Sequence, residues 1–386
     1  MNSQLLTSSK SSLTVPVMAL SLYAVASGYL MSLIPLMLDQ YGLSTDAASW
    51  LASAFYAGLL LGAMFIEPIV AKIGHKSSFI VFLLLFALTI AVMPLFATQE
   101  VWLFARFIAG MAVAGVFVVV ESWLLIGDEK SRTKRLGLYM GALYGGTTLG
   151  QLGIGAFGSQ GIIPFIIILV LVLLSTTILV FGQSNSPSTQ QHMSLSFKHI
   201  TKLNKAAIIG CIVSGLLLGS IYGLMPLELQ ARHVTIEQIG ILMALLVLGG
   251  MAVQPIVSWA SNKVSHNLLM GLFCVLGVFA LGLTTLTDNK MVLAISLVLL
   301  GMATFSLYPI AITLGCIGMN ESYIVSVTQV MLLSYSVGSV SGPMVAHSFM
   351  HNPEGLMGYL FVTLLATALY MFATSLKSKP RMVAGG

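Results

Sequence analysis

The sequence predicts an all-α integral membrane protein with twelve transmembrane helices in two pseudo-symmetric six-helix bundles. Of its 386 residues, 57% are apolar and only 8% are charged, and the mean hydropathy is +0.98. About a quarter of the residues in a soluble domain are charged. The chain also divides into twelve apolar runs of span length, and its basic residues fall mainly in the loops of one side.

The first half contains six apolar runs, each close to the 20 or so residues that cross a bilayer as a helix. Polar or charged breaks separate them, such as Asp39–Asp46 after the first run and Lys72–Lys76 after the second. The expected spans cover residues 15–38, 47–70, 77–97, 101–126, 136–157 and 161–182.

A long polar stretch, residues 183–205, follows the sixth span and is rich in Ser and Gln, as flexible linkers are. We therefore expect an N-terminal bundle over residues 1–182, this linker, and a C-terminal bundle over residues 206–386. The second set of spans is expected at residues 206–229, 238–260, 268–287, 291–316, 323–346 and 356–376.

The 17 Lys and Arg residues are distributed unevenly over the loops. If the N-terminus is cytoplasmic, fourteen of them are cytoplasmic, only Arg232 and Lys290 lie outside, and Arg106 lies within a span. This asymmetry is the positive-inside pattern. It predicts that both termini and the linker are cytoplasmic, and it attributes the formal charge of +5 to topology rather than to nucleic-acid binding.

The two halves repeat when the sequence is shifted by 191 residues without a gap. The shift superposes Gly28 on Gly219, Pro35 on Pro226, Gly58 on Gly249, Lys72 on Lys263 and His75 on His266. Parallel repeats of this kind are a transporter architecture with the substrate site between the halves.

The loop after the second span reads Glu67-Pro-Ile-Val-Ala-Lys-Ile-Gly-His-Lys76. It resembles the G-x-L-A-D-R-x-G-R-K loop of the major facilitator superfamily, although Ala71 replaces the acid. The resemblance implies a gate at this loop, with Glu67 as a candidate for the missing charge. The gating candidates are Glu67, Lys72, Gly74, His75, Arg135, Lys263 and His266; topology determination alone is the alternative for the lysines.

Three further segments resemble one bacterial subgroup of that superfamily, the YcaD-like proteins. They are Val120–Leu124, which is followed by a glycine-rich fifth span, Ser306–Ile310 in the tenth span, and Gly338–Pro343 in the eleventh. The resemblance covers essentially the whole chain and implies a multi-pass protein of the bacterial cytoplasmic (inner) membrane.

Charged groups at membrane depth are costly and usually face a cavity or a partner. We therefore expect Arg106 to bind an anionic group or to pair with a proton-carrying acid, although pairing with helix carbonyls is the structural alternative. Glu121 resembles an acid at this helix end in many major facilitators. It is expected to form a gate salt bridge with Lys72 or Arg135, with proton coupling as the alternative.

Polar and small residues in the spans give weaker signals. Gln151, Tyr335 and Tyr29 are candidates to line the pathway, and interhelical hydrogen bonding is the alternative. Small residues on one face permit close helix packing, either static or as a pivot. The residues expected to do so are Gly146, Gly150, Gly338, Gly342 and Pro343.

The resemblance implies a secondary transporter that works by alternating access. We expect proton-coupled efflux of a small organic solute by an antiporter, with uptake by a symporter or uniporter as the alternative and a channel or sensor as a remote one. No P-loop, nucleophile elbow or metal-ligand cluster occurs, so we expect neither an enzyme, a cofactor nor a metal. The expected partners are the substrate, the lipid bilayer and protons, and the expected state is a monomer.

Overall fold

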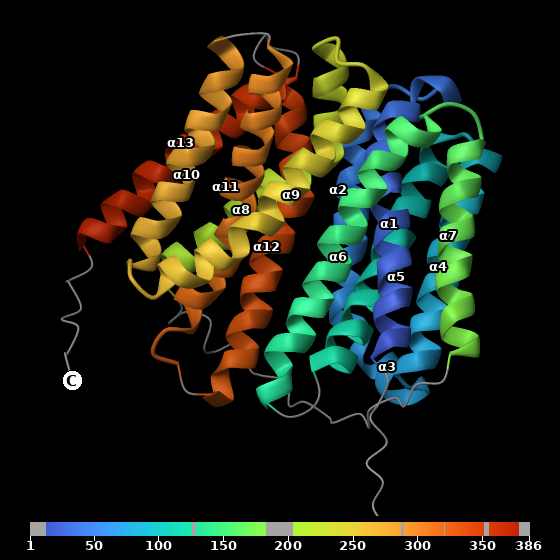
Figure 1. Cartoon of the computed structure of the whole chain (residues 1–386), viewed down its shortest axis with the longest axis horizontal. Coiled ribbons are helices and arrows are strands. Elements are labelled where there is room, and N and C mark those ends of the chain that lie inside the picture. The colour runs from blue at the N-terminus through green and yellow to red at the C-terminus, as the bar shows by residue number, and fades with distance from the viewer. Residues whose placement is uncertain are drawn as a thin grey trace, which may run out of the picture.

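The computed structural model describes residues 13–125, 129–182, 204–286, 289–319, 321–350 and 355–377, and within them every regular element is helical (Figure 1). The predicted fold class is confirmed. The first half contains α1 (Thr14–Met37), the short η1 (Asp39–Tyr41), α2 (Ala47–Phe65), α3 (Glu67–Ile73), α4 (His75–Leu95), α5 (Gln99–Leu125), α6 (Glu129–Phe157) and α7 (Ile163–Phe181). The second contains α8 (Lys205–Ala231), α9 (Ile236–Ser261), α10 (His266–Leu286), α11 (Lys290–Cys316), α12 (Glu321–Phe349) and α13 (Gly355–Lys377).

Ten helices in the described part are long and apolar enough to cross a bilayer. The helices α6 and α12, each 29 residues long, complete the twelve spans. These two are equivalent under the repeat, being the fifth span of each half. Both contact the opposite half, α6 through α9 and α12 through α2. Polar side chains on these two helices can therefore face the other half instead of lipid. The linker predicted over 183–205 lies outside the described residues except for its last two, and the Asn204 side chain caps α8 by accepting from the Ala206 N–H at 2.9 Å.

The second predicted span, over 47–70, was wrong in one respect, because it breaks at Ile66 into α2 and α3. Pro68 stands in the first turn of α3, where its missing N–H costs nothing, whereas in the middle of a continuous helix it would remove a backbone bond. The turn between α3 and α4 occurs at Gly74, whose φ of +83° with ψ of 159° is a conformation that only glycine adopts readily.

The two halves pack by the same pattern. In the first, α1 packs on α6 and α7, α2 on α5, and α4 on α5 and α7; in the second, α8 packs on α12 and α13, α9 on α11, and α10 on α11 and α13. The helix axes approach most closely at equivalent glycines. A Cβ atom on Gly58 or Gly110 would overlap backbone between α2 and α5, and one on Gly249 or Gly301 would do so between α9 and α11.

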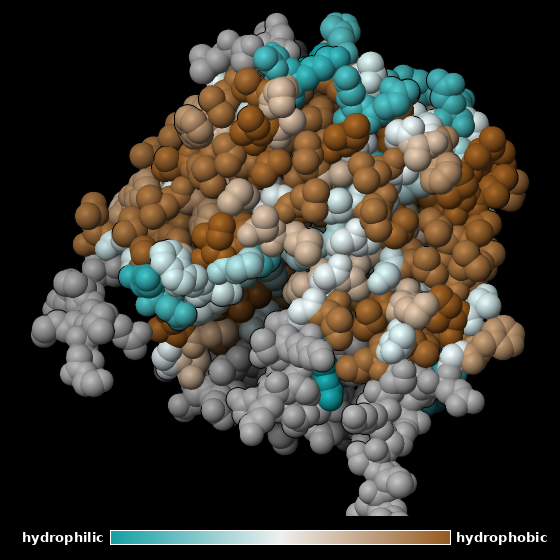
Figure 2. Space-filling view, viewed as in Figure 1, coloured by the Kyte–Doolittle hydropathy of each residue, from teal (hydrophilic) through white to brown (hydrophobic). Residues whose placement is uncertain are grey.

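Contacts between the halves concentrate toward one end of the molecule, which is uppermost in Figure 1. Here the side chains of Asp46 and His347 lie 3.7 Å apart, and a Cβ on Gly240 would meet the backbone of Gln151. We call this the closed end. The opposite end, which carries α3, is the open end, and the surface in Figure 2 is hollowed between the halves below mid-height.

Candidate functional site

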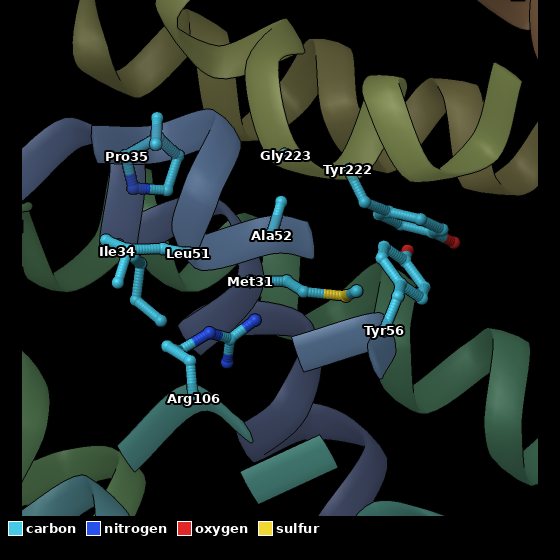
Figure 3. A pocket seen from close by; sticks show the side chains of 10 residues that line it. Met31, Ile34, Pro35, Leu51, Ala52, Tyr56, Arg106, Tyr222 and Gly223 are labelled. Atoms are coloured by element: carbon cyan, nitrogen blue, oxygen red, sulfur yellow. The ribbon is translucent and has the colours of Figure 1, made fainter. Parts of the chain in front are cut away.

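A small pocket of about 20 Å³ lies between the halves, on the closed-end side of the middle. Its lining residues come from three helices of the first half and one helix of the second. Figure 3 shows how their side chains converge. Its lining is mostly apolar, with one charge and two phenol groups. The lining residues are Met31, Ile34, Pro35, Ala48, Leu51, Ala52, Tyr56, Arg106, Tyr222 and Gly223.

Arg106 provides the charge of this pocket. It lies seven residues into α5, about 10 Å along the helix from the closed end, and only 5% of it is exposed. Its guanidinium lies over the Phe55 ring, 4.3 Å from the centroid, while its Nε has no hydrogen-bond partner among the described residues. No acid of the described chain forms an ion pair with it. A buried cation with so little compensation is equipped to bind an anion.

Two tyrosines lie within electrostatic range of this guanidinium, Tyr23 from α1 and Tyr56 from α2. Tyr56 and Tyr222 lie side by side at the edge of the pocket (Figure 3). Because α8 supplies Tyr222, the pocket changes shape whenever the halves move relative to each other. These three tyrosines were not found by sequence reasoning, since a tyrosine in an apolar run carries no signal of which way it faces.

Glu121 lies fifteen residues beyond Arg106 on the same helix, about 22 Å toward the open end. It is exposed and accepts a hydrogen bond from the Tyr139 hydroxyl at 3.0 Å. Among the described residues Glu121 forms no ion pair with Lys72, so the salt bridge predicted between these two is absent there.

The predicted gating residues lie at the open end of the molecule. Glu67, Lys72 and Lys263 are exposed, and no ion pair in the described chain involves them. Lys263, just beyond the end of α9, instead lies 4.2 Å from the ring of Trp259 in the last turn of that helix. His75 is buried against Trp123, with ring centroids 6.3 Å apart.

Arg135 and His266 are both half-buried in this structure. The Nε2 atom of His266 is buried without a hydrogen-bond partner in the described part of the chain. Lys76 has a distinct role, because it donates to the carbonyl of Gly182 at 3.0 Å and so joins the start of α4 to the end of α7.

Two residues expected on the pathway are buried elsewhere, which corrects that expectation for this conformation. The Tyr29 hydroxyl donates to the Gly158 carbonyl at 2.6 Å, near the closed end. Gln151 is fully buried and accepts from the Ser32 hydroxyl at 2.6 Å. Each of these two hydrogen bonds connects α1 with the end or the interior of α6 and satisfies a buried polar atom. Tyr335, by contrast, is half-buried and contacts Tyr308, with ring centroids 4.9 Å apart.

The glycines expected to pack helices lie at two equivalent contacts. A Cβ on Gly146 or Gly150 would overlap α1, and one on Gly338 or Gly342 would overlap the backbone of α8. Pro343 follows at the α12–α8 contact, close to Gly223. That these helices pivot at the glycines during transport stays a prediction.

The sequence is similar to a family model and to two bacterial proteins. A family model described as Major Facilitator Superfamily matches residues 17–343. The chain is 32% identical over 385 residues to a protein of Escherichia coli strain K12 named "Uncharacterized MFS-type transporter YcaD", covering 97% of this chain and 99% of that one. The protein of that name from Salmonella enteritidis PT4 is 33% identical over 387 residues, with the same coverage.

Solved structures share the fold. The nucleoside transporter NupG superposes with a TM-score of 0.72 at 15% identity, covering 94% of this chain and 96% of that one. A bacterial homologue of the human lysosomal transporter Spinster, in an inward-facing and occupied conformation, superposes with a TM-score of 0.74 at 15% identity, covering 96% and 98%.

Proposed function

Because the chain belongs to the major facilitator superfamily and is a multi-pass membrane transporter rather than an enzyme, we propose that it exports a small organic anion by proton-coupled alternating access. The observation that carries this proposal is Arg106, a buried guanidinium without an acidic partner in the described chain, directed into a pocket between the halves. A neutral or cationic solute would leave this charge uncompensated, whereas a carboxylate or phosphate would neutralise it.

The orientation follows from the loops. The open end carries Lys72, Lys76, Arg135 and Lys263, and the closed end carries Arg232 and Lys290. Basic residues concentrate on the cytoplasmic side, which supports an inward-open conformation with cytoplasmic termini. Arg106 then lies at the apex of a cleft that a cytoplasmic solute can enter.

Outward transport is favoured by the charge of the solute. An inside-negative membrane potential drives an anion out of the cell by about 2.3 kcal/mol per charge for each 100 mV. Uptake of the same anion would have to overcome this term, and a symporter would need additional protons to do so. Efflux is therefore the proposed direction, with uptake as the alternative.

Glu121 and Tyr139 are the proposed proton-coupling pair. The carboxylate is exposed and hydrogen-bonded to the phenol. It lies on the same helix as Arg106, about 22 Å toward the open end. In this mechanism a proton on Glu121 accompanies the return of the empty carrier.

The test is a thermal-shift screen of matched carboxylates and their amides on purified protein, with Arg106→Gln and Lys290→Gln beside wild type. Lys290 is exposed, so its variant removes the same charge away from the pocket. We expect carboxylates but not amides to stabilise wild type and Lys290→Gln, and neither to stabilise Arg106→Gln. Stabilisation of Arg106→Gln by the same carboxylates would contradict the anion site.

Each carboxylate that binds is then loaded into proteoliposomes, with a pH gradient and a membrane potential imposed separately. We expect the pH gradient to accelerate transport of the anion by wild type and the potential to set its direction. Transport that is indifferent to the pH gradient would remove proton coupling from the proposal and leave the anion site standing.

A further inference from the structure

Six aromatic side chains from five helices of both halves line the pocket that holds Arg106 or form ring contacts with one another. We call them the aromatic cluster: Tyr56, Tyr144, Tyr222, Phe305, Tyr308 and Tyr335. Phe305 is its centre, with Tyr144 at 5.8 Å and 72° and Tyr222 at 6.1 Å and 87°, both edge-to-face. Tyr308 and Tyr335 form a second pair at 4.9 Å.

The two groups of rings are continuous with each other and with the pocket. Tyr222 lies in the pocket lining and 6.1 Å from Phe305, and Tyr308 follows Phe305 by three residues on α11, which places the two rings on one face of that helix. Tyr56 and Tyr222 also line the pocket that holds Arg106 (Figure 3). One surface of aromatic rings therefore extends from the cation into the cleft.

The cluster differs from ordinary helix packing in composition and exposure. The chain has 19 phenylalanines and 12 tyrosines, yet five of the six cluster residues are tyrosines. Tyr144, Tyr222, Tyr308 and Tyr335 are only half-buried. Partly exposed phenol rings at a lipid-shielded depth provide flat apolar faces together with hydroxyl groups that hydrogen-bond to a solute.

The pair Tyr144–Phe305 joins α6 of the first half to α11 of the second. Alternating access moves the halves against each other, so this ring contact cannot keep one fixed geometry through the cycle. Rings that separate during the cycle expose their faces, and a planar group of the solute can replace the lost contact.

We infer that the transported anion carries an aromatic ring, with its anionic group on Arg106 and its ring among the cluster. This inference rests on the proposed function, because it takes Arg106 as the anion site. Aromatic pairs gain free energy from ring quadrupoles beyond the area that they bury. An aliphatic or inorganic anion would leave that gain unused, and an aromatic cation would be repelled by Arg106.

The experiment measures binding of the purified full chain to matched pairs of carboxylates by calorimetry. Phenylacetate, 3-phenylpropionate and 4-phenylbutyrate place a ring at increasing distance from the carboxylate, and their cyclohexyl counterparts keep the size and charge but lack π electrons. We expect at least one phenyl compound to bind about two- to tenfold more tightly than its cyclohexyl counterpart.

Variants assign this preference to the cluster. Tyr222→Leu and Phe305→Leu should each weaken binding of the phenyl compound more than binding of its cyclohexyl counterpart and so abolish the preference, and Tyr222→Phe should keep the preference. Phe104→Leu is the matched control, because Phe104 is 67% exposed on the opposite face of α5. Unliganded melting temperatures report folding, and Tyr222→Leu decides the result if Phe305→Leu fails to fold.

The outcomes separate the two proposals. Equal affinities for phenyl and cyclohexyl compounds, both lost in Arg106→Gln, would overturn the aromatic inference and leave the anion site in place. Affinities that Arg106→Gln does not change would overturn the anion site and this inference with it. Tighter binding of phenethylamine than of any phenyl carboxylate, or no binding of any probe up to its solubility limit, would also overturn the inference.

Discussion

The guanidinium carbon of Arg106 lies 4.3 Å from the centroid of the Phe55 ring, and each residue is 5% exposed. Cation–π contact recovers about 0.5 to 2 kcal/mol, whereas placing an arginine in the membrane costs roughly 2.5–3.5 kcal/mol on insertion scales. The ring therefore offsets only part of the cost. It also holds the guanidinium in one position without neutralising it, which keeps the charge available to a ligand.

The first prediction follows from this imbalance. Arg106→Gln should raise the free energy of unfolding by about 1 kcal/mol, because it removes an incompletely compensated charge from the membrane interior. Transport of the anion should fall by roughly 10- to 150-fold, the ratio that loss of a hydrogen bond to a charged group gives. Melting temperature in detergent and proteoliposome flux measure the two effects. A variant that is destabilised and still transports would show that Arg106 has a structural role.

The second prediction concerns Glu121, the acceptor of the Tyr139 hydroxyl. Glu121→Gln keeps the size of the side chain but cannot take up and release a proton. We expect it to abolish acceleration by a pH gradient while exchange of substrate across equal pH on both sides continues. Tyr139→Phe, which removes only the hydrogen bond, should shift the pH dependence of transport without abolishing it. If Glu121→Gln responded to the pH gradient as wild type does, the coupling site would lie elsewhere.

Much of the fold could be predicted because hydropathy alone separates the spans, and in lipid each span must satisfy its backbone as a helix. The break at Ile66 was missed because Pro68 lies within an apolar run, and hydropathy does not register a missing N–H. Gly58 and Gly249, which the repeat superposes, also lie at equivalent packing positions, because both lie against backbone of a neighbouring helix.

The site was less predictable. Arg106 could be found because a charge within a span has few alternative explanations. Tyr56, Tyr222 and Phe305 could not be found in this way. The hydropathy of an aromatic residue in an apolar run is the same whether the side chain faces lipid, a neighbouring helix or a cleft. Tyr29 was a pathway candidate for its polarity, and Gln151 for its polarity and the glycine-rich helix face beside it. The structure shows the alternative, interhelical hydrogen bonding, and these bonds join residues more than a hundred positions apart.

The third prediction tests the equivalence of the halves. Gly110→Ala and Gly301→Ala each place a methyl group into backbone, the first between α5 and α2 and the second between α11 and α9. Both should lower the free energy of unfolding by about 1–3 kcal/mol, as overpacking does. Gly137→Ala is the control, since nothing lies within 4 Å of its added Cβ, and a helical Gly→Ala change should stabilise by up to about 1 kcal/mol. Equal stability of all three variants would refute the close helix contacts.

The fourth prediction concerns Glu228, near the end of α8, together with Asp39, just after α1. The structure buries Glu228 to 5% exposure, with one carboxylate oxygen 2.8 Å from Nε of Arg232 and the other 2.8 Å from the N–H of Leu356 in the first turn of α13. Both partners donate hydrogen bonds to the carboxylate. In Glu228→Gln one of these donors faces the amide NH₂, which cannot accept, so the substitution should lower the free energy of unfolding by about 1–3 kcal/mol.

Asp39→Asn, at an exposed position of the equivalent end of the first half, should change stability by less than about 0.5 kcal/mol. The flux per folded Glu228→Gln molecule should match wild type, because the carboxylate joins α8 to α13 within one half and bridges no moving contact. Thermal unfolding and flux normalised to folded protein distinguish the two roles. A stable Glu228→Gln variant with reduced flux would instead identify Glu228 as part of the gate.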